Sequence, residues 1–544
     1  MGSSRMNPNA PVTKKNRRIP LANVAGLLIV TALLGQVLGF LRTKLINANF
    51  STPITPHSQN AGVYFAAFNI PDFFFYTIAA GALGVAFMPY LTDRLHKGDK
   101  HGMWELANSL LNLLSIIMLF VGLIIFVFAK PLLHHVVAPG LTPDQLNNAA
   151  AIMRLLALNP FLFTIAGILT TAQQSLGRFF FYAIAPLFYN LCIILSIYIF
   201  RHTSVGIVGL GIGAFIGAIL QLCIVIFGLI GTKFHWHWRI LWKNSEFKGM
   251  LHALPPRSLD QGMDQVQSIV ETNFASNRHL GGATAISNYN NAFILQSAPI
   301  LLIGTAISTA AFPRLNQRLS QGRPDLFRKD FLMILRAMIW ITMPIIIIAY
   351  FTRGYLARLI FTANAPDIAL IFGFLTGAIF FRIMYAIMSR WFYAQKDTKT
   401  PLFVSIFTIG FNVFLAWKLS QPSAYGVAGL ALAQSIVAAV EVIILAAIML
   451  KRDRGLFNAA FWGGVVRTIS VTGFSVVAGF IMISLYPLGI NDTGLITLGG
   501  KLALISGVVL GVHVGMSALF GLEEVRPFLY RAKRLIFKPL RLDL

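Results

Sequence analysis

The sequence predicts an all-α polytopic membrane protein with fourteen transmembrane helices, arranged as two parallel six-helix lobes and a terminal helix pair. Three observations lead to this fold class. Hydrophobic residues make up 56% of the 544 residues and charged residues only 12%, whereas soluble domains carry roughly 25% charged residues. Apolar runs long enough to cross a bilayer recur along the whole chain. Short motifs also recur in the same order in its two halves.

The predicted spans follow from the length of these apolar runs, because a helix needs about 20 mainly apolar residues to cross the hydrocarbon core. The segments that meet this requirement are 22–46, 62–92, 104–130, 148–174, 179–200, 205–231, 255–277, 284–312, 329–352, 365–389, 399–418, 425–450, 459–486 and 495–520. The first segment is longer than the apolar core of a signal peptide and lacks a convincing cleavage site. We therefore expect an uncleaved first span.

Basic residues are distributed unevenly between the connectors and predict the orientation of the chain. One set of connectors, together with both chain ends, holds most of the 44 Lys and Arg residues, for example "DRLHKGDKHG" (93–102) and "LKRDRG" (450–455). The opposite set includes 47–61 and 487–494, which have none. The positive-inside rule then places both termini in the cytoplasm. Because the basic residues punctuate apolar runs and form no single patch, the net charge of +25 does not indicate nucleic-acid binding.

Outside the spans the chain shows few chemical motifs. Cys192 and Cys223 both fall within apolar segments, which excludes a disulfide framework or a CxxC metal site. No GxxxxGK[ST] motif is present, so an ion gradient or the membrane potential must drive any transport. The stretch "FHWHWRILW" (234–242) is typical of an interfacial anchor, and metal binding by its two histidines is the less favoured interpretation.

Four pairs of motifs indicate an internal repeat. They are "QVLGFLRT" (36–43) with "QVQSIVET" (265–272), "PYLTDRL" (89–95) with "PRLNQRL" (313–319), "APLF" (185–188) with "TPLF" (400–403), and "GIVGLGI" (206–212) with "GVAGLAL" (426–432). An even number of spans per repeat keeps both halves in the same orientation, and such halves enclose a cavity suited to alternating access. The predicted parts are a basic tail (1–20), an N-lobe (21–232), a C-lobe (250–451), a terminal pair (455–521) and a second basic tail (522–544).

Charged residues inside the spans are the candidate functional groups, because a charge in the bilayer centre is costly and rarely idle. The repeat makes Arg42 and Glu271 equivalent positions in the two halves. Either Arg42 contacts substrate in a central cavity, or it forms a structural ion pair with Glu271. Lys44 is more readily explained by snorkelling to the nearer interface.

The seventh span carries an unusual polar stripe. Asp260, Asp264, Gln267 and Glu271 follow i, i+4, i+7, i+11 spacing, which places their side chains on one face of a helix. Exposing three carboxylates to lipid would cost too much free energy. We therefore expect the stripe to face the interior of the protein. There it either lines a water-filled pathway that binds a cation, proton or substrate group, or forms structural pairs, with Arg257 as one partner.

Pro71 interrupts the second span, within "FNIPDFFFYTIAAGALG" (68–84). Proline removes a backbone hydrogen bond and bends a helix. This feature suits a gating segment, and a plain structural kink explains it equally well.

The motifs also resemble those of a known family, the lipid II flippases (MurJ/MviN) of the MOP exporter superfamily, over about residues 25–520. "RWFYAQKDTKTP" (390–401) closely resembles the family pattern Phe-Tyr-Ala-x-x-Asp-Thr-x-Thr-Pro, and "AISTAAFPRLNQ" (306–317) resembles Ala-x-x-Thr-x-x-x-Pro-x-Leu-Ser. "QVLGFLR" (36–42) and "YFAAFNIPDFFF" (64–75) are similar to its first- and second-helix patterns. Arg42 matches the second arginine of the first-helix pattern, whereas Gln36 stands where the first arginine is usual.

The resemblance implies a flippase, not an enzyme, that moves the undecaprenyl-linked peptidoglycan precursor (lipid II) across the bacterial cytoplasmic membrane by alternating access. It implies a cationic cavity for the pyrophosphate, with substrate-binding candidates Arg42, Lys44, Arg257, Gln36 and Asn291. The gating or ion-coupling candidates are Asp260, Asp264, Glu271, Asn412 and Pro71. No metal cofactor is expected beyond Na⁺ near Glu271 and Asn412, or H⁺, as a coupling ion. The expected partners are a lipid-linked substrate, the bilayer and peptidoglycan synthesis enzymes, and no nucleic acid.

Three alternatives remain open. The chain could export another lipid-linked oligosaccharide or a drug on the same fold, or it could be a transport-inactive scaffold in cell-wall assembly. The third alternative is a membrane-embedded transferase that acts on polyprenyl phosphates. The sequence has no DxD-type or histidine-rich loop to supply the catalytic groups of such an enzyme.

Overall fold

The computed structural model describes residues 21–52, 55–80, 87–361, 363–526 and 530, and all regular elements in this part of the chain are helices. For residues 21–25, 29, 80 and 253–261 it describes the backbone path but not the side chains. The predicted tail 1–20 and most of the predicted tail 522–544 lie outside the described residues.

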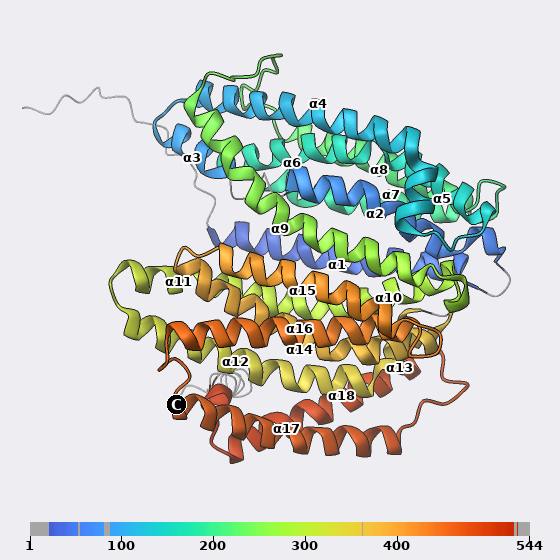
Figure 1. The fold of residues 1–544 in the computed structure, drawn as a ribbon, viewed down its shortest axis with the longest axis vertical. Helices are drawn as coiled ribbons and strands as arrows, with labels where there is room; N and C mark the ends of the chain where they lie inside the picture. Colours follow the sequence, from blue (N-terminus) through green and yellow to red (C-terminus); the bar gives the residue numbers. More distant parts are fainter. Residues whose placement is uncertain (1–20, 53–54, 81–86, 362, 527–529, 531–544) are drawn as a thin grey trace, which may run out of the picture.

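The first lobe forms the upper half of Figure 1, from α4 at the top to α1 at the interface with the second lobe. Its elements are α1 (Leu21–Phe50), η1 (His57–Gln59), α2 (Ala61–Phe74), η2 (Phe75–Ala80), α3 (Met88–His96), α4 (Lys100–Leu132), η4 (Leu133–Val137), α5 (Pro143–Leu156), α6 (Asn159–Ser175), α7 (Phe180–Phe200) and α8 (Val208–Phe227).

Except for α9, which starts beside α3 and runs above α1, the second lobe lies below the first, and the terminal helices cover the outer side of this second lobe (Figure 1). Its elements are α9 (Ser245–Ala275), η5 (Arg278–Leu280), α10 (Ala283–Pro299), η6 (Ile300–Thr305), α11 (Ala306–Ser320), α12 (Pro324–Phe351), α13 (Arg353–Ile360), α14 (Ala365–Ala394), α15 (Lys399–Leu419) and α16 (Val427–Arg452). The terminal elements are α17 (Ala459–Leu485), α18 (Gly494–Leu519) and η7 (Glu523–Val525).

The two lobes repeat the same packing. In the first lobe α1 packs on α7, α7 on α8, and α4 on α6. In the second lobe the equivalent helices pair in the same way: α9 packs on α15, α15 on α16, and α12 on α14. The terminal helices stand outside this scheme, since α17 and α18 pack on each other and on α12. The predicted fold class, with two parallel lobes and a terminal pair, is confirmed.

The second helix of each repeat has the same irregularity. Both α2 and α10 end in a π-helical segment, η2 after Phe74 and η6 after Pro299. Pro71 lies within α2, and the α-helical backbone continues past it to Phe74. The change of helix type therefore follows the proline by one turn.

Twelve helices in the described part of the chain are long and apolar enough to cross a membrane. The two other predicted spans fall on the most polar or most irregular segments. One is 62–92, which α2, η2 and α3 share, and the other is 255–277, which lies within α9. At about 1.5 Å per residue, the 31 residues of α9 are long enough to span a bilayer. The count of fourteen stays a prediction.

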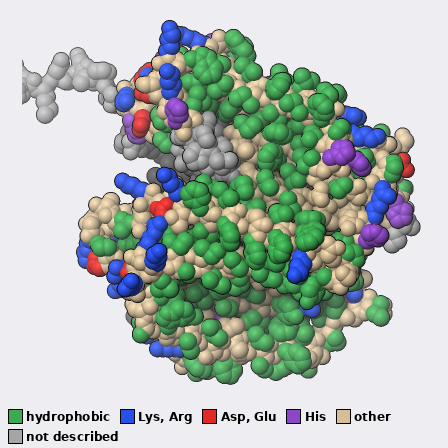
Figure 2. Space-filling model, in the orientation of Figure 1, with side chains coloured by type: hydrophobic (Ala, Val, Ile, Leu, Met, Phe, Trp, Pro, Cys, Tyr) green, Lys and Arg blue, Asp and Glu red, His purple; other side chains and the backbone are tan. Residues whose placement is uncertain are grey.

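One end of the molecule is closed by contacts between the lobes. Gly62 of α2 and Gly140 lie so close to the second lobe that a β-carbon at either would collide with a backbone carbonyl, that of Ala283 or Ser276. Asn60 Nδ2 donates to Thr284 Oγ1 at 3.1 Å across the same contact. At the opposite end, which carries α3 and the α11–α12 connection, Figure 2 shows a hollow between the lobes bordered by Lys and Arg side chains.

Candidate functional site

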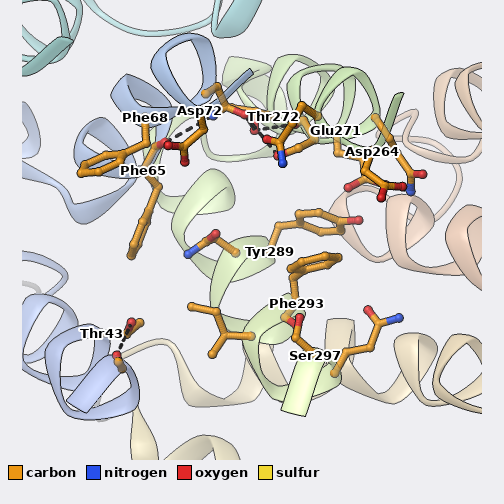
Figure 3. Close-up of a pocket in the computed structure, with 18 of the residues that line it drawn as sticks. Thr43, Phe65, Phe68, Asp72, Asp264, Glu271, Thr272, Tyr289, Phe293 and Ser297 are labelled. Atoms are coloured by element: carbon orange, nitrogen blue, oxygen red, sulfur yellow. Dashed lines mark hydrogen bonds between the residues drawn. The ribbon is translucent and has the colours of Figure 1, made fainter. Parts of the chain in front are cut away.

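A cavity of about 850 Å³ lies between the two lobes, and side chains of both lobes line it (Figure 3). It receives residues from α1, α2, η2, α6 and α7 on one side, and from α9, α10, η6, α14 and α16 on the other. The interface between the two repeated lobes therefore lies at the centre of the molecule, where a substrate can contact both lobes.

Aromatic rings dominate much of the lining. The aromatic residues that line the cavity are Phe40, Tyr64, Phe65, Phe68, Phe75, Tyr76, Phe163, Tyr189, Tyr289 and Phe293. Phe163 packs edge-on against both Phe75 and Tyr189, with ring centroids 5.7 and 5.3 Å apart. Such faces suit the apolar faces of sugar rings and the start of a polyprenyl chain, and they leave orientation to a few polar groups.

Arg42 is the basic residue that α1 contributes to the cavity. Its Nη1 donates to Asn190 Oδ1 of α7 at 3.0 Å. Its Nε is buried and has no hydrogen-bond partner among the described residues. The carboxylate of Asp72 on α2 lines the same cavity and interacts electrostatically with Arg42. One arm of the guanidinium is thus anchored, and its buried Nε is left without a hydrogen bond in the described part of the chain.

The second lobe contributes Glu271, which is 5% exposed, from α9. Its Oε1 accepts from Gln267 Nε2 at 2.8 Å and from Asn412 Nδ2 at 3.5 Å. The Tyr289 side chain projects into the pocket beside it (Figure 3). Glu271 is therefore held by neutral donors of its own lobe.

Arg382 of α14 also lines the cavity, and a network behind it engages its charge. Its Nη1 lies 3.5 Å from Oε2 of Glu441 on α16, and its Nη2 donates to Gln267 Oε1 at 3.4 Å. Glu441 Oε1 also accepts from Ser405 Oγ at 2.8 Å. This network ties α9, α14, α15 and α16 together inside the second lobe.

The charge of the cavity differs from the cationic cavity that the sequence resemblance implied. Among the described lining residues there are three carboxylates, Asp72, Asp264 and Glu271, and two guanidinium groups, Arg42 and Arg382. The reason is local: the neutral Gln36 occupies the lining position where the first arginine of the family pattern is usual, and the aromatic Phe75 and Tyr76 also stand in the lining.

The structure separates the predicted site residues into three groups. Arg42, Gln36, Asp264 and Glu271 line the central cavity. Arg257 and Asp260 lie on the path of α9, but their side chains are outside the described residues. The third group, which lies outside the lining of the cavity, consists of Lys44, Asn291, Asn412 and Pro71.

Lys44 and Asn291 do not line the cavity; they join the lobes near its closed end. Lys44 Nζ donates to the Leu359 carbonyl at 2.9 Å, so the amine is used in a contact between α1 and α13. Asn291 is fully buried and exchanges hydrogen bonds with Asn47 of α1 at 3.0 and 2.8 Å. The neighbouring Asn290 is the asparagine that lines the cavity.

Asn412 and Pro71 also lie behind the lining. Asn412 is 1% exposed and reaches the cavity only through its contact with Glu271. Pro71 is buried beside a void of about 10 Å³ next to Asp72. These positions allow an indirect role and no direct contact with a ligand in the central cavity.

Asp72 and Arg382 also line the cavity; they are charges inside the predicted spans 62–92 and 365–389 and were not among the predicted site residues. The cavity also contains polar groups that sequence reasoning missed. Tyr64, Gln296 and Gln434 each line it with a buried oxygen that has no hydrogen-bond partner in the described part of the chain. The charge of Asp72 and of Arg382 inside an apolar span is a sequence signal that could have assigned both residues to the site. A single Tyr or Gln in an apolar helix is too common to serve as such a signal.

Comparison with known proteins agrees with the fold and the site. A family model described as lipid II flippase MurJ matches residues 57–492. The probable lipid II flippase MurJ of Bdellovibrio bacteriovorus is 24% identical over 546 residues, covering 96% of this chain and 98% of that protein. The counterpart from Vibrio cholerae is 25% identical over 529 residues, covering 90% and 96%.

Two solved structures have the same fold. A lipid II flippase MurJ in an inward closed conformation superposes with a TM-score of 0.73 at 20% identity, covering 92% of this chain and 100% of that one. An inward-facing multidrug resistance MATE transporter of the MOP superfamily superposes with a TM-score of 0.66 at 16% identity, covering 79% and 98%. Because the family model spans most of the chain, this protein belongs to the MurJ lipid II flippase family.

Proposed function

We propose that this protein translocates lipid II, the undecaprenyl-linked peptidoglycan precursor, across the bacterial cytoplasmic membrane. It acts as a transporter by alternating access and catalyses no chemical step. The observation that carries the proposal is the cavity between two repeated lobes in a chain of the MurJ family, with Arg42 in its lining.

Arg42 is the group that we assign to the pyrophosphate. A guanidinium pairs with phosphate oxygens through two parallel hydrogen bonds, and such bonds are stronger inside a membrane protein than in water. Asn190 holds one arm of the guanidinium in place, which lowers the entropy lost on binding. The aromatic lining faces the sugars, and the polyprenyl chain remains in the lipid.

The transport cycle follows from the two ends of the cavity. We assign the hollow end to the cytoplasm, because the basic connectors 93–102 and 450–455 belong to the set of connectors that the positive-inside rule places there. The other end is closed by the contacts at Gly62 and Gly140. Rocking of the lobes separates these contacts, closes the cytoplasmic end and exposes the headgroup to the outside.

Glu271 and Asn412 are the proposed site of a coupling ion, Na⁺ or H⁺. The carboxylate is almost fully buried within the membrane, and Asn412 Oδ1 has no partner in the described part of the chain. An intramembrane acid of this kind is typical of an ion or proton pathway. Replacing Na⁺ by K⁺ in a proteoliposome flipping assay, with wild type and Glu271→Gln compared, decides between the two ions.

Arg42→Ala tests the flippase proposal directly. In cells depleted of their own lipid II flippase, the wild-type protein should restore growth, and Arg42→Ala should not. In proteoliposomes the substitution should weaken lipid II binding about tenfold or more, the loss expected for a charged hydrogen bond.

The matched control is Arg201→Ala. Arg201 directly follows the apolar helix α7, is exposed and lies outside the cavity, and its Nη1 donates to Asn49 Oδ1 at 3.4 Å. It should support growth like the wild type. If Arg42→Ala also supports full growth and binding, the assignment of Arg42 to the pyrophosphate is wrong.

A further inference from the structure

A small void of about 10 Å³ lies in the first lobe, beside the central cavity and apart from the coupling-ion site proposed at Glu271. This is about the room that one water molecule needs. Most of its lining is apolar or aromatic, and Asp72 of α2 and Asn159 of α6 are the polar residues that line it in the described part of the chain. A single small particle in this void therefore meets two side chains that carry oxygen.

Two prolines lie at the same void. Pro71 lies within α2, and Pro160 is the second residue of α6. The helices α5 and α6 form one candidate membrane span, Pro143–Ser175, which is broken between Leu156 and Asn159. Because Pro160 has no N–H, the carbonyl of Leu156, which also lines the void, lacks its usual donor four residues later. Broken helices of this kind supply backbone carbonyls to cations inside membranes.

The oxygens of the two polar side chains are available to a ligand. Asn159 is 3% exposed, and its Oδ1 has no hydrogen-bond partner in the described part of the chain. The interactions of the Asp72 carboxylate with described residues are electrostatic, with Arg42 as the cation, and include no hydrogen bond or ion pair. Carboxylate and carbonyl oxygens are the ligands that hard cations prefer. A water molecule can donate to these oxygens, but it cannot neutralise the charge of the carboxylate.

The surroundings give a cation a route to the void and also limit its affinity. Asp72 lines the central cavity as well as the void, so an ion in the cavity reaches the void past this carboxylate (Figure 3). Arg42 lines the cavity but not the void, and its Nη1 donates to Asn190 at 3.0 Å. The charge of Arg42 therefore weakens cation binding without occupying the site.

We propose that Asp72 and Asn159 bind one Na⁺ ion in this void, with the Leu156 carbonyl and water from the adjoining cavity as further ligands. The ion neutralises a carboxylate inside the membrane, where a charge without compensation is costly, and it ties α2 to the break between α5 and α6. This site goes beyond the proposed function, since it lies in the lobe opposite to Glu271 and does not depend on which lipid is transported.

Equilibrium binding of radioactive ²²Na⁺ to the full-length protein, in nanodiscs of a zwitterionic phospholipid, tests the site. The background is Glu271→Gln, which removes the carboxylate of the other proposed ion site, and the buffer contains K⁺ to suppress nonspecific binding. This protein should bind a single Na⁺ ion saturably. Adding Asp72→Asn should weaken the binding about tenfold or more, the loss expected when one member of a buried charge pair is removed.

Asn159→Ala provides a second variant, because it removes a neutral ligand and leaves every charge in place. It should weaken Na⁺ binding about fivefold, the loss typical of one neutral hydrogen-bonding group. Arg42→Ala removes the opposing charge and should strengthen Na⁺ binding several-fold. Asp144→Asn is the matched control, because Asp144 is an exposed acid in the first turn of α5, outside the void and the cavity. It should bind Na⁺ like the background protein.

Three outcomes would overturn the inference. If the Glu271→Gln protein binds no Na⁺ saturably, the void holds water. Binding that both Asp72→Asn and Asn159→Ala leave unchanged places the ion elsewhere. Binding that Asp72→Asn weakens and Asn159→Ala does not places the ion on the cavity side of Asp72, outside the void. If Asp72→Asn does not fold, as judged by its melting temperature, Asn159→Ala and Arg42→Ala decide. None of these results bears on the flippase proposal, whose tests are growth and lipid II binding.

Discussion

Arg42 illustrates how much one side chain depends on its surroundings. An arginine in the middle of an apolar helix is costly, and here Asn190 compensates part of that cost with a 3.0 Å hydrogen bond. The rival hypothesis paired it with Glu271. In this structure Glu271 accepts from Gln267 and Asn412, and the described contacts include no ion pair between Glu271 and Arg42. The two equivalent positions of the repeat thus have separate partners across one cavity.

Asp397 shows that a family-typical residue can be purely structural. In "RWFYAQKDTKTP" (390–401) its Oδ1 accepts from the backbone N–H of Thr400 at 3.0 Å, at the start of α15. Its Oδ2 lies 2.6 Å from Nη2 of Arg452, at the end of α16. These contacts hold the pKa of Asp397 at about 2, below its usual 3.8. The motif fastens the ends of two helices outside the membrane.

Asp397→Ala should lower the stability of the protein, because it removes both the helix cap and the ion pair. The expected loss is about 1–2 kcal/mol, visible as a lower melting temperature in detergent. Asp397→Asn keeps the capping oxygen and should lose less. A carboxylate with a lowered pKa stabilises the fold above pH 3.8, and this contribution disappears as the pH falls towards 2. The difference between wild type and Asp397→Asn should therefore shrink from pH 5 to pH 2, and a constant difference would contradict the role of the charge.

At the scale of elements, α2 and α10 form the contact that closes one end of the cavity. They are equivalent helices of the repeat, and each ends in a π-helical segment. Their close approach depends on Gly62, whose missing side chain leaves room for the Ala283 carbonyl. Since packed interfaces are bistable and do not deform continuously, a side chain at this position should act on the balance between conformations.

Gly62→Val should shift the protein away from the state closed at this end and block transport. The measurement uses a disulfide between Asn60→Cys and Thr284→Cys, whose side chains are in hydrogen-bond contact here. Cys192 and Cys223, the two native cysteines, are first replaced by serine. Cross-linking should be efficient with Gly62 and several-fold weaker with Gly62→Val. Gly410→Val is the control, because Gly410 is exposed on α15 outside the cavity and a β-carbon there meets no atom within 4 Å. Equal cross-linking in both backgrounds would show that this contact does not govern closure.

At the scale of the whole molecule, the charges and the repeat together set the orientation in the membrane. Basic residues gather around the connectors at the end that carries α3, and the closing contacts lie at the other end. Whether this distribution of charge agrees with the positive-inside rule depends on the number of spans. If 62–92 and 255–277 both cross the bilayer, neighbouring connectors alternate sides throughout, as the positive-inside rule requires.

Cysteine labelling should confirm fourteen spans. His57 and Lys97 are exposed residues on either side of the span at 62–92. In a cysteine-free background, His57→Cys should react with a membrane-impermeant maleimide applied to intact spheroplasts. Lys97→Cys should react only after permeabilisation. Labelling of both from the same side would mean that 62–92 does not cross the membrane, and the prediction of fourteen spans would be wrong.

The sequence by itself determined the class of the molecule, its helical segments, its internal repeat and the presence of charges inside the membrane. These properties follow from apolar length and from local spacing along a helix, which need no knowledge of long-range contacts. The same reasoning recognised Arg42 and Glu271 as equivalent positions, since both lie within matching motifs. It also placed the polar face of α9 towards the interior, where Asp264 and Glu271 are found.

Only the tertiary structure decided which of these polar groups share a cavity and which hold the lobes together. Lys44 and Asn291 seemed equivalent to Arg42 as candidates, yet each is engaged in a contact between the lobes. Asp72 and Arg382 are charges inside predicted spans, but only the structure shows that both line the central cavity. The physical reason is that helical spacing gives the direction of a side chain around its own helix only. Its partner, and with it the sign of the cavity's charge, depends on which neighbouring helix faces that direction.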